Sequence, residues 1–399
     1  MTLHDPNTVR ASVRFIDEHA DEQLQYLIRL SQQNSYSWNK PGTDQVAAMV
    51  LERIGTAFRF HRVVEQTNVG DLHILSNVPP SEKSIYVLAH MDTVFPPEHP
   101  FRECWVDGDE LHGPGTGDMK AGIATLVYAI LALRDARVLD DVPLTVLLAG
   151  DEEVGAVTSR PIHEEETERA LACLVVEGAG ANGEVVVSRY GKINGRLECA
   201  GVDRHVGALN QDKASAVLEL AHKTIGIEGL NGNLPDTRLN VGKVEGGLGP
   251  ATVAASASAL LDIRWKEQAH RDVLVEMVER VVSQTDVRGC SSKFLLLSER
   301  PAWPLTRGTH LLVDLVKAAG AELGQQIDEQ HRVASSDSNF YGAVGVPTVD
   351  GLGPYCEGYH TAKEFVKIST IKERTGLLAN SLLKVADGLT RISSRAGER

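Results

Sequence analysis

Histidine and acidic side chains stand directly after three apolar runs of this sequence. They are His90 after residues 84–89, Glu152 and Glu153 after residues 143–150, and Glu177 after residues 171–176. Short apolar runs are typical of buried strands, and ligands collect beyond the carboxyl ends of the strands in an open parallel sheet. We therefore expect the sheet to bring these four side chains together at one edge.

A glycine-rich loop supplies a fifth candidate residue, which is acidic. Residues 112–122 read HGPGTGDMKAG and lead into a helix of small residues, which we predict over 121–134. Asp118 in this loop is either the N-cap of that helix, since Asp is a favoured cap, or a metal ligand held by a tight turn. Several carboxylates in one cleft repel one another unless cations neutralise them. The joint occurrence of the five residues therefore favours the metal ligand.

This set of side chains combines imidazole with carboxylate and lacks cysteine, which suits Zn, Mn or Co without choosing among them. One more histidine is needed near this edge. His360, in a Gly-Tyr-His-Thr segment after a predicted strand at 346–350, is the candidate. Seven other histidines stand in polar or helical contexts and are expected at the surface: His4, His19, His61, His99, His163, His270 and His310.

The elements that must hold these residues alternate in an α/β rhythm. Apolar residues at helical spacing predict helices over 6–34 and 44–58, and β-type runs predict strands over 72–76, 84–89, 143–148 and 170–176. Strands that alternate with helices favour an open, mostly parallel sheet with helices on both faces. The predicted fold class of this part is therefore α/β.

The pattern changes near Arg189. Between residues 195 and 300 we expect a strand, a helix (213–224), two strands (237–245 and 252–265), a helix (269–284) and a strand (293–298). This β-α-β-β-α-β order is the ferredoxin-like arrangement. The α/β rhythm then resumes with a helix at 309–323, the strand at 346–350 and a last helix starting near Ser369. We predict one α/β domain, residues 1–188 and 301–399, interrupted by an α+β domain at 189–300.

The charge balance limits the partners. Of the 399 residues 54 are acidic and 40 basic, so the formal net charge is −14. Phosphate binding needs a basic face, which counts against nucleic acid and anionic membranes. No apolar run approaches the ~20 residues that span a membrane. The five cysteines are scattered without a CxxC pair, which favours a reducing compartment over a disulfide framework. We expect a cytoplasmic protein.

These motifs closely resemble the di-zinc metallopeptidase family of glutamate carboxypeptidase, aminoacylase, acetylornithine deacetylase and succinyl-diaminopimelate desuccinylase. The best match is to the carboxypeptidase G type of glutamate carboxypeptidase. The matching motifs are AHMDTV at 89–94, GPGTGDMKAG at 113–122, DEEVG at 151–155, VEG at 176–178 and GYH at 358–360. The inserted domain resembles the family's lid and dimerisation domain. The resemblance therefore implies a homodimer formed through that domain.

Carried over residue by residue, the resemblance implies two divalent metal ions, with zinc first and Mn or Co as alternatives. Asp118 would bridge the two ions. His90 and Glu177 would complete one site, and Glu153 and His360 the other. Two metals about 3.5–4 Å apart can hold a bridging water and polarise the scissile carbonyl.

Two further acidic residues acquire roles from the resemblance. Asp92 would accept a hydrogen bond from the second imidazole nitrogen of His90 and so fix its tautomer. Glu152 would be the general base and then the proton donor. One carboxylate must stay off the metals to take the proton, and the Glu152-Glu153 pair offers one ligand and one free base.

The resemblance also implies four residues that meet the substrate. His205, in the inserted domain, is expected to reach the active site of the partner subunit and stabilise the developing oxyanion. Arg264 matches the family arginine that pairs with a substrate carboxylate, a task that suits a guanidinium fork, although an arginine at a strand end is often only part of a surface ion pair. Asp337 and Gly353 belong to loops that should line the same cleft.

We expect a di-metal hydrolase that cleaves an amide bond next to a free carboxylate in a small molecule or short peptide. It would be a carboxypeptidase or an N-acyl-amino-acid deacylase, and Glu177 favours this over an aminopeptidase or dipeptidase by family analogy. The family's Asn-x-x-Pro element, which helps to grip the substrate, is replaced by Ala251 and Ala254, so the natural substrate stays open. A non-catalytic binding protein is a further alternative, disfavoured because every expected ligand and the base are present.

Overall fold

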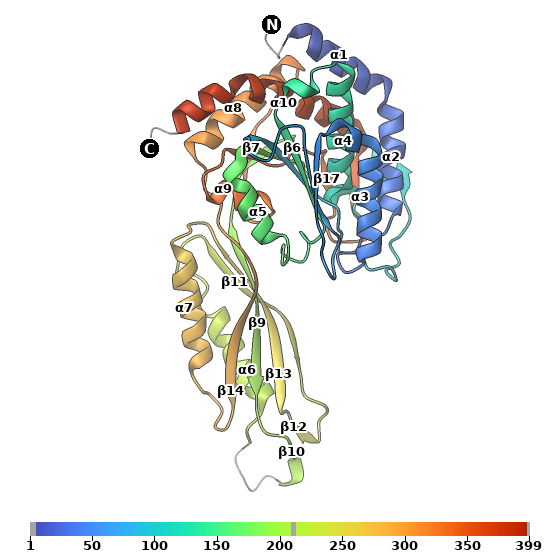
Figure 1. Ribbon diagram of the computed structural model, residues 1–399. Helices are drawn as coiled ribbons and strands as arrows, with labels where there is room; N and C mark the ends of the chain where they lie inside the picture. Colours follow the sequence, from blue (N-terminus) through green and yellow to red (C-terminus); the bar gives the residue numbers. More distant parts are fainter. Residues whose placement is uncertain (1–4, 209–212, 397–399) are drawn as a thin grey trace. The chain divides into compact units, whose positions relative to one another are not determined.

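The computed structural model describes residues 5–208 and 213–396, and the chain folds into two compact units (Figure 1). Unit 1 comprises Met1–Ser188, Leu305–Arg332 and Ser336–Arg399, and unit 2 comprises Arg189–Pro304 and Val333–Ser335. The chain therefore returns to unit 1 at Leu305 rather than at residue 301. It then enters unit 2 once more for three residues, 333–335.

Unit 1 is built on a mostly parallel sheet, which confirms the predicted α/β class. The strand order is β1 (Phe60–Val64), β2 (Leu72–Ser76), β6 (Leu144–Ala149), β3 (Ser84–His90), β7 (Ala170–Val175) and β16 (Thr348–Val349). The last four strands run parallel, whereas β1 and β2 pair in the antiparallel sense. Every residue of β2, β3 and β6 is buried, as expected for strands covered on both faces.

Helices cover both faces of this sheet. On one face lie α1 (Pro6–Glu18), α2 (Ala20–Gln32), α3 (Lys40–Ile54), α4 (Ala121–Asp135), α8 (Arg307–Glu322) and α10 (Ile368–Ala396), and on the other α5 (Arg160–Glu166) and α9 (Ser338–Ala343). Ile85 and Val87 of β3 join the first core, whereas Tyr86 and Leu88 join the second. The two cores follow from the alternation of side chains along a strand.

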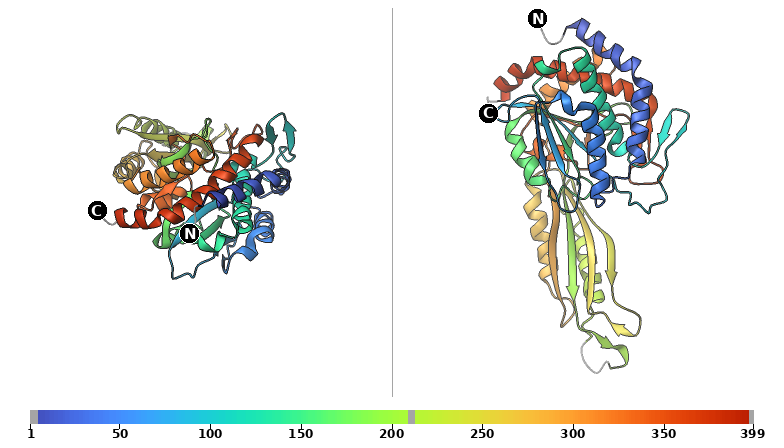
Figure 2. Two further views of the ribbon diagram at one scale, coloured as in Figure 1. Left: turned by 90° about the horizontal axis from the view of Figure 1, so that it is seen from above. Right: turned by 45° about the vertical axis from the view of Figure 1, so that its right-hand side comes forward.

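Helix α4 is buried on all sides. Every residue from Ala121 to Leu133 is buried, and α1 and α10, from opposite ends of the chain, lie side by side close to it (Figure 2). The segment Thr116–Asp135 is apolar and long enough to cross a membrane, but 94% of its 18-residue window is buried inside the protein. Its composition is therefore that of a core helix. Gly122 in its first turn packs against the end of β7, where a Cβ atom would lie 1.9 Å from the Val176 carbonyl oxygen.

Two smaller sheets in unit 1 were not predicted. One consists of β17 (Cys356–Glu357), β18 (Phe365–Lys367), β5 (Glu110–His112) and β4 (Trp105–Asp107), and the other of β15 (Glu329–Arg332) and β8 (Val185–Arg189). Strands of two to five residues give too little alternation to be recognised in a sequence. The β18–β5 pair brings the segment after His360 beside the loop that leads to Asp118.

Unit 2 has the expected β-α-β-β-α-β order. Its elements are β9 (Gly191–Ala200), α6 (Ala216–Glu228), β11 (Thr237–Gly246), β13 (Ser256–Trp265), α7 (His270–Ser283) and β14 (Ser291–Arg300). The strands form an antiparallel sheet in the order β11-β13-β9-β14, which is the ferredoxin-like arrangement. A separate pair consists of β10 (Arg204–His205) and β12 (Thr252–Val253). Buried apolar residues of the sheet and both helices form the core of this unit.

Several predicted boundaries were wrong. The helix expected over 6–34 is two helices, because the backbone leaves the helical conformation at His19 (φ −112°). The second helix begins at Lys40, and the strand expected over 252–265 is interrupted between β12 and β13. The last helix, α10, begins at Ile368, next to the predicted start near Ser369. Short helical turns complete the fold: η1 (Gly55–Ala57), η2 (Thr116–Lys120), η3 (Leu139–Asp141), η4 (Thr167–Arg169) and η5 (Val206–Ala208).

Candidate metal centre

Three neighbouring parallel strands deliver the candidate residues to one edge of the sheet. His90 is the last residue of β3 and pairs with Ala149, the last residue of β6. Glu152 and Glu153 follow β6 closely, and Glu177 follows β7 on the other side of β3. The carboxyl ends of parallel strands form the usual ligand-binding edge of an open sheet.

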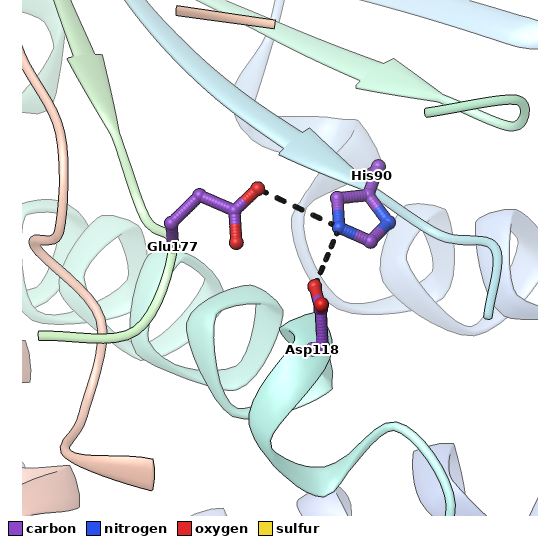
Figure 3. Close-up of side chains that lie close together, drawn as sticks. All are labelled: His90, Asp118 and Glu177. Atoms are coloured by element: carbon purple, nitrogen blue, oxygen red, sulfur yellow. Dashed lines mark hydrogen bonds and ion pairs between the residues drawn. The ribbon is translucent and has the colours of Figure 1, made fainter. Parts of the chain in front are cut away.

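His90, Asp118 and Glu177 form a first group of converging side chains (Figure 3). His90 Nε2 lies 3.0 Å from Asp118 Oδ1 and 3.6 Å from Glu177 Oε1. The potential ligand atoms of the three residues all lie within 4.8 Å of one another. One imidazole and two carboxylates at this spacing can hold one divalent ion.

Asp118, Glu153 and His360 form a second group. His360 Nε2 lies 3.2 Å from Asp118 Oδ2 and 3.0 Å from Glu153 Oε2. The two carboxylate oxygens of Asp118 therefore face different groups. The backbone of His360 has a φ of 61°, in the left-handed region that non-glycine residues rarely adopt and that is frequent at functional sites.

The loop before α4 turns Asp118 toward the histidines. Asp118 lies within η2 but has a non-helical backbone (φ −122°, ψ 94°), and the peptide bond to Met119 is cis. Helix α4 has Lys120 at its N-cap position and no side-chain cap hydrogen bond. The interpretation of Asp118 as an N-cap is therefore wrong.

Asp92 connects the histidine of one group with the glutamates after β6. His90 Nδ1 lies 3.0 Å from the carbonyl oxygen and 3.3 Å from the Oδ1 atom of Asp92. The same carboxylate accepts hydrogen bonds from the backbone N–H groups of Glu152 (3.2 Å) and Glu153 (3.1 Å) and from the Ser37 hydroxyl (2.7 Å). Asp92 is fully buried, so it fixes the position of the His90 ring relative to the backbone of Glu152 and Glu153.

The concentration of acidic groups draws positive charge to the site. Burial opposes a charged His90, but hydrogen bonds to Asp118 and Asp92 outweigh it and raise the pKa of His90 well above its usual value. Hydrogen bonds to Asp118 and Glu153 raise the pKa of His360 to about 11. Bonds from the two histidines lower the pKa of Asp118 despite its burial. The carboxylates of the centre therefore stabilise positive charge, whether on the two histidines or on a bound cation.

Glu152 lies beside both groups. Glu152 is buried, and the neighbouring Glu153 directs its Oε2 atom to His360. Burial is the main cause that raises the pKa of Glu153, to about 8, and of Glu177, and the charges of Asp118 and Glu152 add to it. Among the described residues Glu152 belongs to neither ligand group, although its charge acts on a member of each.

The predicted residues of unit 2 have local partners. His205 Nδ1 accepts a hydrogen bond from the Gly207 N–H at 3.0 Å. Arg264 donates from Nε and Nη2 to the two carboxylate oxygens of Asp262 (2.7 and 2.9 Å) and from Nη1 to the Val333 carbonyl (2.9 Å). Arg264 thus forms a bidentate ion pair with Asp262, and its role in binding a substrate stays a prediction.

The altered segment 251–254 lies directly beside His205. Thr252 pairs with His205 in the β10–β12 ladder, and the Ala251 carbonyl accepts from the Val206 N–H at 3.0 Å. Ala251 and Ala254, where the resemblance predicts Asn and Pro, therefore flank the strand that pairs with His205.

Asp337 is paired with a histidine that we expected at the surface. Asp337 is buried, and its Oδ2 lies 3.2 Å from Nε2 of His163. His163 is fully buried and stacks on Phe340, so its predicted exposure was wrong. Its apolar surroundings include Phe340 and Tyr341 of α9, which belong to the second core. His4 lies outside the described residues.

Gly353 lies behind Glu177. Its N–H donates to the Glu177 carbonyl at 2.8 Å, and a Cβ atom at this position would lie 2.7 Å from that same oxygen. The Gly353 carbonyl in turn accepts from Nε of the buried Arg374 at 3.0 Å. Arg374 also donates to the carbonyls of Gly351 and Gly183. Gly353 therefore contacts the backbone of a candidate ligand.

Two charged residues near the centre were missed. Glu364 is fully buried and accepts hydrogen bonds from the backbone of the Asp118 loop. Arg332, at the end of β15, lies near Tyr359 and Cys356. Burial raises the pKa of both groups, and the positive charge of Arg332 opposes that rise. Tyr359 precedes His360, and Cys356 Sγ lies 3.4 Å from the Gly117 carbonyl. No local pattern marks either charged residue, because both are placed by short strands.

The donor set fits divalent metal ions. The two groups supply imidazole nitrogens and carboxylate oxygens, which Zn²⁺, Mn²⁺ and Co²⁺ accept. Glu153 Oε1 is buried and has no hydrogen-bond partner among the described residues, which is costly for a carboxylate oxygen unless a cation completes its contacts.

Added metal is expected to stabilise the folded chain. Binding only to the folded state contributes about 2.7 kcal/mol per site at 100 times the dissociation constant. Such a contribution raises the Tm of a unit of this size by roughly 5–10 °C. Calorimetry of chelator-treated protein with and without Zn²⁺, Mn²⁺ or Co²⁺ measures this shift, with Mg²⁺ as the control that prefers all-oxygen sites. An unchanged Tm with all three metals would contradict the proposal that these residues bind divalent metal ions.

Comparison with known proteins agrees with this geometry. Residues 86–384 match the model of peptidase family M20/M25/M40. Carboxypeptidase G2 of Pseudomonas sp. (strain RS-16) is 28% identical over 313 residues, which cover 77% of this chain and 75% of that protein. Succinyl-diaminopimelate desuccinylase of Shewanella pealeana is 26% identical over 306 residues, covering 71% of this chain and 77% of that protein.

Solved structures show the same fold. The di-peptidase Dug1p of Saccharomyces cerevisiae superimposes with a TM-score of 0.76 at 13% identity, covering 95% of this chain and 98% of that one. At this identity the likeness concerns the fold alone.

Proposed function

Because this chain belongs to peptidase family M20/M25/M40, it is a metal-dependent amide hydrolase, and we propose that it cleaves an amide bond next to a free carboxylate. It acts as a carboxypeptidase or an N-acyl-amino-acid deacylase of the glutamate carboxypeptidase kind. The observation that carries this proposal is Asp118, whose two carboxylate oxygens face two separate groups of potential ligands, with Glu152 beside both.

Two divalent ions, zinc being the first choice, would occupy the proposed centre. His90, Asp118 and Glu177 would hold one, and Asp118, Glu153 and His360 would hold the other. Mn or Co suit the same ligands. When bound, such ions polarise the scissile carbonyl and lower the pKa of water.

The protein's own residues move the proton. The Glu152 carboxylate takes a proton from the attacking water as the water oxygen bonds to the carbonyl carbon. It then delivers this proton to the amide nitrogen as the C–N bond breaks, so that one water is consumed for each bond cleaved. Asp92 supports both ends of this arrangement, because it contacts His90 and the backbone of the Glu152-Glu153 turn.

His205 stabilises the developing oxyanion in this proposal, and it acts in the active site of a second copy of the chain. A dimer formed through unit 2 is supported by apolar side chains on the surface of α6. Val217, Leu218 and Ile225 are 43, 45 and 73% exposed, beside the edge strand β11. Apolar surface gathered on one element is typical of an interface.

Two arginines are candidates for the substrate carboxylate. Arg264 is proposed from the resemblance, although Asp262 already engages two of its nitrogens. Arg332 is proposed from its position near Tyr359, next to the candidate ligand His360. Asp337 and Gly353 support the cleft from buried positions.

Steady-state kinetics of two variants compare the arginines. If Arg332 binds the substrate carboxylate, Arg332→Met raises KM more than Arg264→Met does.

The protein is proposed to work in the cytoplasm on small molecules or short peptides, without nucleic acid or membrane as a partner. All five cysteines are free in the structure, which suits a reducing compartment. The formal net charge of −14 disfavours polyanionic partners.

A substrate panel tests the proposed activity. With Zn²⁺, Mn²⁺ or Co²⁺ supplied, N-acyl-glutamates and other N-acyl amino acids are expected to give at least about tenfold higher kcat/KM than free-amino dipeptides, a difference of about 1.4 kcal/mol in transition-state stabilisation. The reason is that recognition is proposed to rest on the carboxylate next to the cleaved amide.

The outcome of the panel separates the alternatives. Preference for free-amino dipeptides would establish an aminopeptidase or dipeptidase instead. Hydrolysis of no amide by the metal-loaded protein would favour the non-catalytic binding protein.

A further inference from the structure

Glu364 is a buried carboxylate that binds the loop of Asp118 through three backbone groups. Its Oε1 accepts from the N–H groups of Gly117 (2.8 Å) and Asp118 (2.9 Å), and its Oε2 accepts from the N–H of Gly115 (3.2 Å). Glu364 itself is fully buried. Three hydrogen bonds from backbone N–H groups fix this buried side chain on the loop.

Both partners are placed for this contact by the local fold. Gly115 has a φ of 71°, a conformation that glycine adopts without strain and that turns successive N–H groups toward one point. On the other side, Phe365 of β18 pairs with His112 of β5. This register sets Glu364 beside the start of the loop, where its carbonyl also accepts from the Gly113 N–H at 3.4 Å.

The contact links Asp118 with the turn that carries His360. The Glu364 N–H donates to the Thr361 carbonyl at 3.2 Å, and the Thr361 N–H donates to the Gly358 carbonyl at 3.1 Å. Glu364 thus belongs to the same compact turn as His360. The buried Glu364 carboxylate therefore connects Asp118 with the exposed turn that carries His360, through short hydrogen-bonded paths.

Rotation of Asp118 affects both ligand groups at once. Its Oδ1 lies 3.0 Å from His90 Nε2, and its Oδ2 lies 3.2 Å from His360 Nε2. The bond from the Asp118 N–H to Glu364 fixes the backbone from which this side chain extends. Loss of that bond frees the one residue that the two groups share.

We propose that Glu364 is a positioning residue for the metal centre, which orients Asp118 for both ions and keeps it in register with His360. This inference rests on the proposed function, because it assumes that Asp118 binds metal. It predicts a loss of affinity at both sites together, since outer partners of metal ligands typically contribute 10–100-fold to metal affinity or activity.

The test uses Glu364→Gln and Glu364→Ala in the full-length chain. Gln keeps the shape and one acceptor oxygen, whereas Ala removes all three bonds. We expect Zn²⁺ dissociation constants about 10–100-fold higher at both sites, with the larger effect in Glu364→Ala. The visible absorption spectrum of the Co²⁺-loaded protein, which reports ligand geometry, is expected to change as well.

A matched control separates positioning from stability. Glu166→Gln replaces another fully buried glutamate of unit 1, whose bonds go to Tyr86, Arg62 and Arg169. This variant is expected to lower the Tm while the Zn²⁺ stoichiometry, affinity and Co²⁺ spectrum stay those of the unmodified protein. If Glu364→Ala does not fold, Glu364→Gln alone decides the comparison.

The failure of this inference differs from that of the proposed function. If both Glu364 variants bind two Zn²⁺ ions with unchanged affinity and spectrum, Glu364 is a structural residue only. If the unmodified protein itself binds no Zn²⁺, Mn²⁺ or Co²⁺, the proposed function is wrong.

Discussion

Glu152→Gln is expected to lower kcat by about 10²–10⁴-fold, the usual contribution of a general base, while both metal ions stay bound. The amide has nearly the shape of the carboxylate but cannot take a proton from water. Among the described residues Glu152 belongs to neither ligand group, so its replacement leaves the ligand atoms in place. Steady-state kinetics together with metal analysis of the same sample measure both parts of the expectation.

The neighbouring glutamate is the matched control. Glu153 differs from Glu152 by one position, and its Oε2 lies 3.0 Å from His360 Nε2 in the second group. Glu153→Gln is therefore expected to lose metal from that group, whereas Glu152→Gln is not. Equal metal loss in the two variants, or near-normal turnover in Glu152→Gln, would contradict the assignment of the base.

Asp118→Asn is expected to abolish activity and to weaken the binding of both metal ions. An amide presents one neutral oxygen where the carboxylate presents two charged ones, and those two oxygens face different groups. The effect should exceed the 10–100-fold that outer partners contribute. Titration with Zn²⁺ of protein freed from metal measures the affinity and the number of ions.

Variants of the two histidines show whether Asp118 is shared. His90→Ala and His360→Ala each remove a ligand of one group and are expected to lose one ion while the other stays. If Asp118→Asn also loses only one ion, the two groups do not share this residue. If each histidine variant loses both ions, the sites bind cooperatively and the separate assignment of ligands fails.

The edge of the sheet was predictable because long apolar runs define where strands end. β3 ends at His90 and β7 ends two residues before Glu177, and every residue of both strands except Leu171 is buried. The residue type that follows such a strand therefore indicates what lies at the ligand-binding edge. The role of Asp118 could not be predicted from its local sequence alone, because an Asp before a helix is also typical of an N-cap.

The contacts behind this edge were not predictable in the same way. Glu364 meets Asp118 across 246 residues of sequence, through the register of a three-residue strand. His163 of α5 and Asp337 before α9 meet because these two short helices pack against each other. Such pairs depend on tertiary packing, and neither partner carries a signal of its own.

The partner of Arg264 could have been predicted from the sequence, although only an ion pair in general was considered. Asp262 and Arg264 are two residues apart on β13, so their side chains leave the same face of the strand. An acid and a guanidinium at this spacing form an ion pair readily, and the structure shows it. The predicted substrate role of Arg264 therefore competes with a partner inside its own strand.

The absence of a side chain at Gly122 has a consequence for the dimensions of the centre. The first turn of α4 meets the Val176 carbonyl so closely that a Cβ atom would lie 1.9 Å from it. Asp118 precedes this turn and Glu177 follows Val176, so backbone touching backbone sets the gap between two candidate ligands. A single added methyl group at residue 122 would push the first turn of α4 away from Val176 and so widen the spacing of the two ligand-bearing segments.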